Sequence, residues 1–158
     1  MSRAFQKVEI TPAHMDVLAE LHGEAFSDGW DASAFLSAIS QPGAFGFIVT
    51  QGDEPLGFAL LRAATFPGGG GEAEVLTIAT RPRALRQGVA RTAMAAAITR
   101  AGALGVERVF LEVAEDNLAA RALYESLGFA DVGRRKAYYE RGVNPRMDAI
   151  VMALNVKP

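Results

Sequence analysis

The sequence predicts a mixed α/β fold, in which one mostly antiparallel sheet carries helices on both of its faces. Strand-type and helix-type segments follow one another in the order β-α-α-β-β-β-α-β-α-β-β. Hairpin turns and crossover helices both occur, so antiparallel and parallel strand pairs are expected in the same sheet. At 158 residues, of which 50% are hydrophobic, the chain has the size of one domain with one core. We therefore expect residues 1–158 to form a single domain.

The first half of the chain predicts a strand, two helices and a hairpin. Thr11-Pro12 suits the start of a helix, and Asp31 suits the N-cap of a second helix that ends before Pro42-Gly43. His14 and His22 are interpreted as lying on the polar face of the first helix, and no role is assigned to them. The expected strands are 5–10, 45–50 and 56–64, with a turn at 51–54 between the last two.

The second half alternates strands with crossover helices. The glycines at 68–71 precede the first of these strands, and we expect this flexible run to lie next to the functional site. An alanine-rich helix and a second helix closed by Gly128 follow the pattern of good helix formers ended by glycine. The expected strands are 73–80, 109–113, 129–139 and 149–154, and the expected helices are 88–104 and 117–127.

Composition excludes several classes of function. A net charge of -2 lacks the basic excess of a nucleic-acid-binding protein. The absence of cysteine excludes disulfides, thiol catalysis and cysteine-based zinc sites, and two histidines are too few for a histidine metal cluster. The first ten residues lack a signal peptide's apolar core, and no apolar run approaches the ~20 residues of a membrane helix. We therefore expect a cytoplasmic protein without a metal, a membrane or a nucleic acid as partner.

A loop between the strand at 73–80 and the alanine-rich helix has the features of an anion site. Gly88 and Ala90 allow close approach of a ligand to the backbone, and the first amides of a helix have no internal partner. Together with the helix dipole, these amides favour a diphosphate. Four arginines cluster around this loop and are expected to add positive charge: Arg81, Arg83, Arg86 and Arg91. The same residues also fit a simple glycine turn with solvated arginines.

The next strand and helix carry three further candidates. Glu112 lies near the end of an apolar strand, where a buried carboxylate of raised pKa would serve as a general base, although it also fits a residue that faces solvent. Asn117 and Tyr124 are seven residues apart, so two turns of helix place them on roughly one face. Asn117 also fits a plain N-cap, and Tyr124 a half-buried aromatic residue with its hydroxyl at the surface.

These segments resemble the GNAT family of N-acetyltransferases. The loop is similar to that family's acetyl-CoA loop, Gln/Arg-x-x-Gly-x-Gly/Ala, with Leu85 in the place of Gln or Arg. The run 111–113, Asn117 and the run 122–129 resemble the GNAT subgroup that acetylates protein N-termini, typified by the ribosomal-protein-alanine N-acetyltransferases. The similarity extends from about Glu72 to Leu154, whereas the first 60 residues share only the strand–helix–helix plan and Trp30.

The resemblance implies acetyl-CoA as co-substrate and a role for each matching residue. Glu112 would be the general base, directly or through a water, and Tyr124 the general acid for the departing CoA thiolate. The residues implied for the cofactor are Ile78, Ala79 and Thr80 along the pantetheine arm, Arg86, Gln87, Gly88, Val89, Ala90 and Arg91 at the diphosphate, and Asn117 at the arm. A base is needed because amines are mostly protonated at neutral pH. Direct attack on the thioester needs no acyl-enzyme, in agreement with the missing cysteine.

Several alternatives stay open at this stage. Glu74, two residues from Glu72 on one strand face, is a second candidate base or a solubility device of an edge strand. Trp30 and Tyr138 are the candidate acceptor-binding residues, although Trp30 also fits a core position. The acceptor is a protein N-terminus or a small-molecule amine, and a non-catalytic acyl-CoA sensor is the alternative outside enzymes. A dinucleotide oxidoreductase does not fit, because no Gly-x-Gly-x-x-Gly run follows the first strand. The chain is expected to be a monomer or a homodimer.

Overall fold

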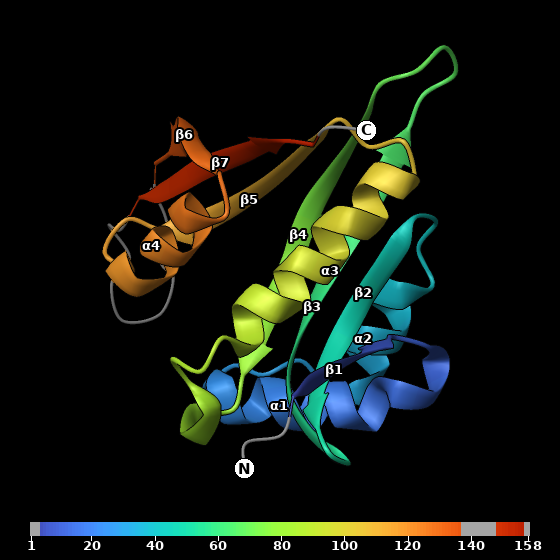
Figure 1. Ribbon diagram of the computed structural model, residues 1–158, viewed down its shortest axis with the longest axis vertical. Coiled ribbons are helices and arrows are strands. Elements are labelled where there is room, and N and C mark those ends of the chain that lie inside the picture. Colours follow the sequence, from blue (N-terminus) through green and yellow to red (C-terminus); the bar gives the residue numbers. More distant parts are fainter. Residues whose placement is uncertain (1–3, 137–147, 157–158) are drawn as a thin grey trace.

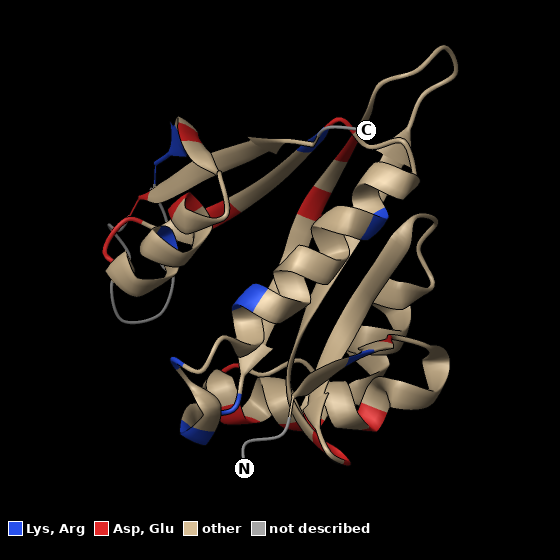
Figure 2. Cartoon of the chain, in the orientation of Figure 1, with Lys and Arg blue, Asp and Glu red and all other residues tan. Residues whose placement is uncertain are grey.

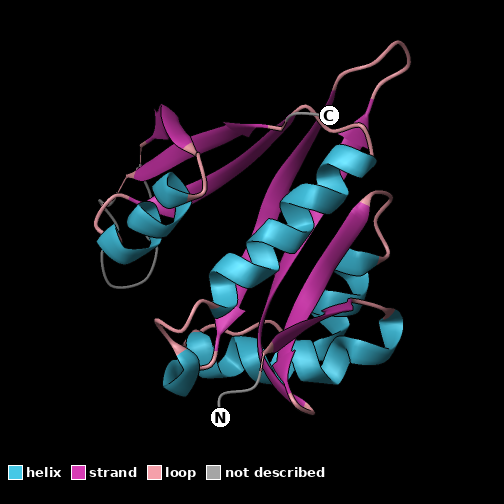
Figure 3. Ribbon diagram, viewed as in Figure 1, coloured by secondary structure: helices cyan, strands magenta, loops and turns pink. Residues whose placement is uncertain are grey.

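The computed structural model describes residues 4–136 and 148–156, and these form a sheet between two layers of helices (Figures 1 and 3). Helices α1 and α2 lie on one face, and α3 and α4 lie on the other. The helices are α1 (Met15–Ala25), α2 (Ala32–Ile39), α3 (Val89–Ala103) and α4 (Leu118–Ser126), with short 3-10 turns η1 (Pro12–His14) and η2 (Pro82–Ala84). The strands are β1 (Phe5–Glu9), β2 (Ala44–Gln51), β3 (Glu54–Thr65), β4 (Gly71–Thr80), β5 (Arg108–Ala114), β6 (Ala130–Arg135) and β7 (Ala149–Asn155).

The seven described strands follow the order β1-β2-β3-β4-β5-β7-β6. All neighbours are antiparallel except β4 and β5, which are parallel and are joined by the crossover through α3. This arrangement confirms the predicted mixed, mostly antiparallel sheet. The last strand of the chain lies between β5 and β6, so the C-terminal segment fills the interior of the sheet instead of extending its edge.

Side-chain caps fix the starts of the helices where the sequence predicts them. The carboxylate of Asp31 accepts the amide of Ala34 at 2.8 Å, and the side-chain oxygen of Asn117 accepts the amide of Ala120 at 3.2 Å. Thr11 caps η1, so the first helix opens with a turn of 3-10 helix before α1. Each cap supplies a partner to one of the amides that a helix start leaves unpaired.

The core consists of two clusters, one on each face of the sheet. The α3 and α4 side contains apolar residues of β3, β5 and β7 packed on α3, with Met94, Val109 and Met152 fully buried. The α1 and α2 side contains Leu18 and Phe58 among its fully buried residues. Burial of each such side chain is worth about 1.5–3 kcal/mol, so the clusters hold both helix layers firmly on the sheet.

Two sequence-based expectations about position are wrong. His22 is 4% exposed and belongs to the buried face of α1, because it follows Leu18 by four residues and continues the core stripe of that helix. The glycine run 68–71 lies at the tip of the β3–β4 hairpin, where β4 begins, as the upper loop in Figure 1 shows. The length of β4 separates this tip from the loop after Thr80 by roughly 30 Å.

The predicted last hairpin is described in part. Strand β6 covers Ala130–Arg135, within the expected range 129–139, and β7 matches the expected strand at 149–154. Residues 137–147 lie outside the described part, and with them Tyr138. Within the described residues, none of the helices is both long and apolar enough to span a bilayer.

Candidate active site

The sheet divides where β4 and β5 separate. The two parallel strands pair only at Glu72–Arg108, Ala73–Val109 and Glu74–Phe110. Beyond these pairs, β4 stays with β3 and β5 stays with β7, and Figure 1 shows the two strands leaving one another. In the described chain, the β5-facing edge of β4 from Val75 onward therefore has no strand partner. The backbone groups on this edge can form hydrogen bonds with an extended ligand, in the same way as they would with an additional strand.

A β-bulge lies at the start of this open edge. Leu61 pairs with Val75 and Leu60 with Thr77, so Leu76 is the extra residue of β4. Bulges bend a strand, increase its local twist and redirect its side chains. Here the bulge turns both Leu76 and Thr77 toward the α1 and α2 face, while Ile78 packs against the other cluster. It thus marks the point at which β4 turns away from β5.

The loop after β4 presents unpaired amides at the N-terminus of α3. Gly88, with φ of 87°, is the N-cap, and Arg86 also has a positive φ, 64°. The first helical bond runs from the Thr92 amide to the Gly88 carbonyl at 3.0 Å. Among the described residues, none of the backbone hydrogen bonds outside the helices and strands is donated by an amide of 86–91. Left-handed residues next to a helix start form an anion-binding concavity, and the positive end of the helix dipole adds to it.

The arginines around this loop divide into two groups. Arg81 is almost buried and bonds to Glu24 at 2.6 Å, Glu20 at 3.4 Å and the Pro55 carbonyl at 2.7 Å. Arg83 pairs with Glu54, which raises the pKa of the Arg83 guanidinium and lowers the pKa of the Glu54 carboxyl. The expectation that both add free positive charge to the loop is therefore wrong.

Arg86 and Arg91 are the two arginines of the group that no carboxylate neutralises within the described chain. Arg91 donates to the hydroxyl of Ser126 and so bridges α3 to α4. Figure 2 shows basic residues gathered at this end of α3. Arg86 and Arg91 are therefore the charged side chains that remain available beside the helix-start amides.

Helix α4 places Tyr124 beside the divided part of the sheet on the α3 face. The Tyr124 ring packs edge-on against Phe129, with 6.0 Å between ring centroids, and belongs to the α3-side cluster. Burial raises the pKa of the Tyr124 phenol above its usual value, so the hydroxyl keeps its proton at neutral pH. Asn117 caps the same helix, as its simpler interpretation predicted, and stays exposed at the start of α4.

Glu112 projects from β5 to the opposite face. Its neighbours Leu111 and Val113 are buried against the α3-side core, so the alternate side chain points toward the α1 and α2 face. The Glu112 side chain is 46% exposed, and Nε and Nη2 of Arg135 each lie 2.7 Å from its Oε1. The carboxylate is thus solvent-facing and held by an arginine, which agrees with the second of the two interpretations that the sequence left open and not with a buried carboxylate.

Glu74 shares the face of Glu112 but lies in a different setting. It belongs to the three-residue segment in which β4 and β5 are still paired, and its side chain is exposed. Glu112 lies two residues beyond the last β4–β5 pair, beside the opening. Of the two carboxylates, Glu112 is therefore the one next to the divided strands.

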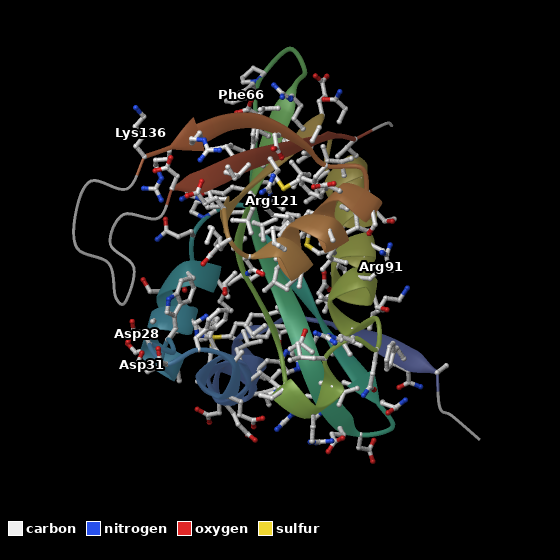
Figure 4. The ribbon with its side chains drawn as sticks, turned by 90° about the vertical axis from the view of Figure 1, so that its left-hand side faces the viewer. Asp28, Asp31, Phe66, Arg91, Arg121 and Lys136 are labelled. Atoms are coloured by element: carbon white, nitrogen blue, oxygen red, sulfur yellow. The ribbon has the colours of Figure 1, made fainter. Side chains whose placement is uncertain are left out.

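The turn between α1 and α2 borders the Glu112 face of the sheet. Asp28 and Asp31, on either side of Trp30, lie across the sheet from Arg91 (Figure 4). Trp30 is half-buried, and its ring stacks near His22 and Phe35 at centroid distances of 5.3 and 5.2 Å. It therefore joins the α1-side core and also keeps an exposed edge.

Sequence analysis missed two partners of this region. His22 binds the Trp30 amide through Nδ1 at 2.9 Å and Thr77 Oγ1 through Nε2 at 3.1 Å. Its spacing from Leu18 indicated a buried position, but its polarity led to the opposite interpretation. Arg135 as the partner of Glu112 depends on the strand order, for which the sequence held no signal. In the described part of the chain, no three His, Cys, Asp or Glu side chains are grouped as a metal site requires.

Comparison with known proteins gives consistent similarities. Residues 13–129 match the model of the Acetyltransferase (GNAT) family. The ribosomal protein bS18-alanine N-acetyltransferase of Escherichia coli is 34% identical over 143 residues, which cover 89% of this chain and 92% of that protein. Its Haemophilus ducreyi counterpart is 32% identical, with 66% and 69% covered.

Solved structures agree with this similarity. The crystal structure of the E. coli ribosomal-protein-alanine N-acetyltransferase superposes with a TM-score of 0.84 at 29% identity, covering 98% of this chain and 96% of that one. Arabidopsis thaliana NAA60 in complex with acetyl-CoA shares the fold, with a TM-score of 0.82 at 16% identity and 97% and 99% covered. The divided sheet and the amide-lined loop are thus found in a chain whose fold neighbours include an acetyl-CoA complex.

Replacing Gly88 with valine tests the loop. We expect Gly88→Val to raise the Kd for acetyl-CoA at least about tenfold, or ~1.4 kcal/mol, because a branched side chain at this positive φ distorts and crowds the amides. In the unliganded protein an added Cβ would meet only Phe5, at 4.0 Å, so the fold itself has room for it. Isothermal titration calorimetry with acetyl-CoA measures the change.

Gly69→Val is the matched control for this experiment. Gly69 also has a positive φ, 99°, with nothing within 4 Å of an added Cβ, and it lies at the distant hairpin tip. It should suffer the same backbone strain without any change in acetyl-CoA affinity. Equal affinities in the two variants would contradict the assignment of residues 86–91 to the diphosphate.

Proposed function

Because the chain belongs to the GNAT family of acetyltransferases and uses acetyl-CoA, we propose that it acetylates the α-amine of a protein N-terminus. The observation that carries this proposal is the divided sheet, with Glu112 on the α1 and α2 face and Tyr124 on the α3 face. The names of the relatives at 34% and 32% identity support the acceptor class. We propose further that residues 1–158 act as a single N-acetyltransferase domain.

The cofactor is proposed to lie along the open edge of β4. The backbone of Ile78, Ala79 and Thr80 would pair with the amide groups of the pantetheine arm, and the amides of 86–91 would hold the diphosphate. Asn117, at the start of α4, would contact the arm from the other side. This route supports the proposal because it gives partners to backbone groups at the far end of the open edge and at the start of α3.

The chemistry follows from residues on opposite faces of the opening. The amine nitrogen attacks the thioester carbonyl carbon, the new C–N bond forms and the C–S bond breaks. Glu112 takes a proton from the amine, directly or through a water, and Tyr124 gives its proton to the departing sulfur. A backbone amide near Ile78 would stabilise the oxyanion that develops in between. The base Glu112 would lie on the α1 and α2 face, where the acceptor amine enters, and the acid Tyr124 on the α3 face. This arrangement suits two substrates that approach the opening from opposite faces of the sheet.

The exposed setting of Glu112 favours an α-amine as acceptor. An N-terminal amine has a pKa near 8, whereas a lysine-like amine has a pKa near 10.4. The free-energy cost of deprotonation at neutral pH is therefore much smaller for the N-terminal amine. A carboxylate that is in contact with solvent can pass the proton on through water. The guanidinium of Arg135 fixes Oε1 of Glu112 and leaves Oε2 for the proton. The ion pair with Arg135 thus leaves Oε2 of Glu112 as the oxygen that accepts the proton.

A panel of acceptors tests the proposed function. Release of CoA thiol from acetyl-CoA is measured with short peptides that differ at residue one, and with polyamines and aminoglycosides. We expect turnover with a class of peptides that have a free N-terminus, and none with the same peptides blocked at the α-amine but carrying a lysine. Turnover with small amines alone would overturn the acceptor class. Thermal stabilisation by acetyl-CoA without any turnover would instead favour a binding-only sensor.

Replacing Glu112 with glutamine tests the base. Glu112→Gln keeps the shape of the side chain and removes its charge, so kcat should fall about a hundredfold, with the Kd for acetyl-CoA changed less than about twofold. Glu74→Gln is the matched control, since Glu74 lies on the same face in the paired part of β4. It should keep wild-type kcat. The reverse pattern would move the base to Glu74.

Replacing Tyr124 with phenylalanine tests the acid. Tyr124→Phe keeps the ring against Phe129 and removes the proton donor, so kcat should fall about a hundredfold while the melting temperature stays unchanged. In the wild-type enzyme, burial raises the pKa of Tyr124, so the phenol stays protonated at neutral and mildly alkaline pH, and kcat should not fall in that range through ionisation of Tyr124. Unchanged turnover in the variant would reduce Tyr124 to a packing residue.

A further inference from the structure

One buried polar group takes no part in the chemistry above. Within residues 4–136 and 148–156, His22 is the one polar or charged side chain that is buried. Four aromatic rings surround it, those of Phe26, Trp30, Phe35 and Phe58, at centroid distances of 4.5, 5.3, 5.4 and 6.4 Å. Burial lowers the pKa of His22, so the imidazole is neutral at neutral pH. An apolar side chain would fill this space without the cost of desolvation, so packing alone does not explain a histidine here.

The imidazole uses both of its nitrogens to join two separate parts of the chain. The Trp30 amide donates to Nδ1, and this bond leaves Nδ1 without a proton. The neutral ring therefore carries its proton on Nε2, which donates to Thr77 Oγ1. His22 thus fixes the α1–α2 turn at one nitrogen and strand β4 at the other.

Both attachment points lie at the proposed site. Thr77 belongs to the bulge of β4, beside Ile78 and beyond the last β4–β5 pair. Trp30 lies in the turn that borders the Glu112 face. The same turn packs closely on α1 at Gly29, where an added Cβ would lie 2.9 Å from Gly23 Cα. A shift of the α1–α2 turn would therefore move the β4 bulge through His22, and a shift of the bulge would move the turn.

We propose that His22 is a positioning residue for acetyl transfer: it ties the acceptor-side turn at Trp30 to the β4 bulge at Thr77, and so sets the acceptor against the thioester. The inference goes beyond the roles of Glu112 and Tyr124 and rests on the proposed function for which side the acceptor enters. Misplacement of reacting groups by about 1 Å can cost on the order of a hundredfold in rate, so such a tie has kinetic consequences.

Two substitutions of His22 separate its two bonds. His22→Asn keeps an acceptor near the Nδ1 position for the Trp30 amide but is too short to reach Thr77. His22→Gln keeps a donor near the Nε2 position for Thr77 and loses the acceptor for Trp30. Thr77→Val removes the hydroxyl with little change of shape and leaves His22 in place. Phe35→Leu, in the same aromatic cluster, is the control for packing.

The kinetic constants are measured below the melting temperature of every variant, with whichever acceptor of the panel turns over. We expect His22→Asn and Thr77→Val to lower kcat about tenfold with little change in the KM for acceptor. His22→Gln should raise the KM for acceptor about tenfold, and Phe35→Leu should lower only the melting temperature. If every variant loses thermal stability while kcat and both KM values stay within twofold of wild type, His22 is a packing residue and the proposal fails.

A second measurement needs no acceptor and separates this proposal from the acceptor assignment. Amide hydrogen exchange of residues 26–31 is followed with and without acetyl-CoA. In the wild type, acetyl-CoA on β4 should slow exchange in the turn, because His22 transmits the ordering of β4. In Thr77→Val this slowing should disappear, although Thr77 itself does not belong to the turn. Slowing that persists in Thr77→Val would overturn the tie through His22, whatever the acceptor is.

Discussion

The structure depends on the short pairing between β4 and β5. Three residue pairs hold the two strands together, and the bulge at Leu76 then turns β4 away. The backbone groups of β4 beyond this pairing have no strand partner among the described residues on the β5 side, so they are available to a ligand. The helix layers stabilise the opening: α3 holds β4 and its neighbours, and α4 packs beside β5. The proposed positions of the cofactor, the acceptor and the catalytic groups all lie around this opening.

The anion site proposed at the start of α3 combines backbone amides with few free side-chain charges. Arg81 is bound to carboxylates of α1, and Arg83 is bound to Glu54 at the start of β3. These ion pairs tie the loop after β4 to α1 and β3. The attraction for an anion then rests on oriented amides, whose effect is short in range and depends on geometry. Leu85, where similar loops carry Gln or Arg, is tolerable for the same reason, because an amide cradle does not need that side chain.

Local patterns predicted most of the fold, and long-range partners account for what they missed. Caps at Thr11, Asp31 and Asn117 and the alternation within strands located the elements to within a few residues. The insertion of β7 between β5 and β6 has no local signal, and the pairing of Arg135 with Glu112 follows from that insertion. His22 shows a different limit, since the helical period placed it inside while its chemistry suggested the surface. Glu112, Asn117 and Tyr124 could be proposed together from the sequence because one strand–turn–helix unit contains all three.

The hairpin tip at 68–71 has a practical consequence. Its glycines are remote from the opening, and an added Cβ at Gly68 or Gly69 would meet no atom within 4 Å. Doubling the length of a flexible loop costs only about 0.6 kcal/mol in closure entropy. A fluorophore, an affinity tag or a surface tether inserted there would leave the strands in register. The tip is thus a point at which the enzyme can be immobilised or labelled at the end of the β3–β4 hairpin away from the loop after Thr80.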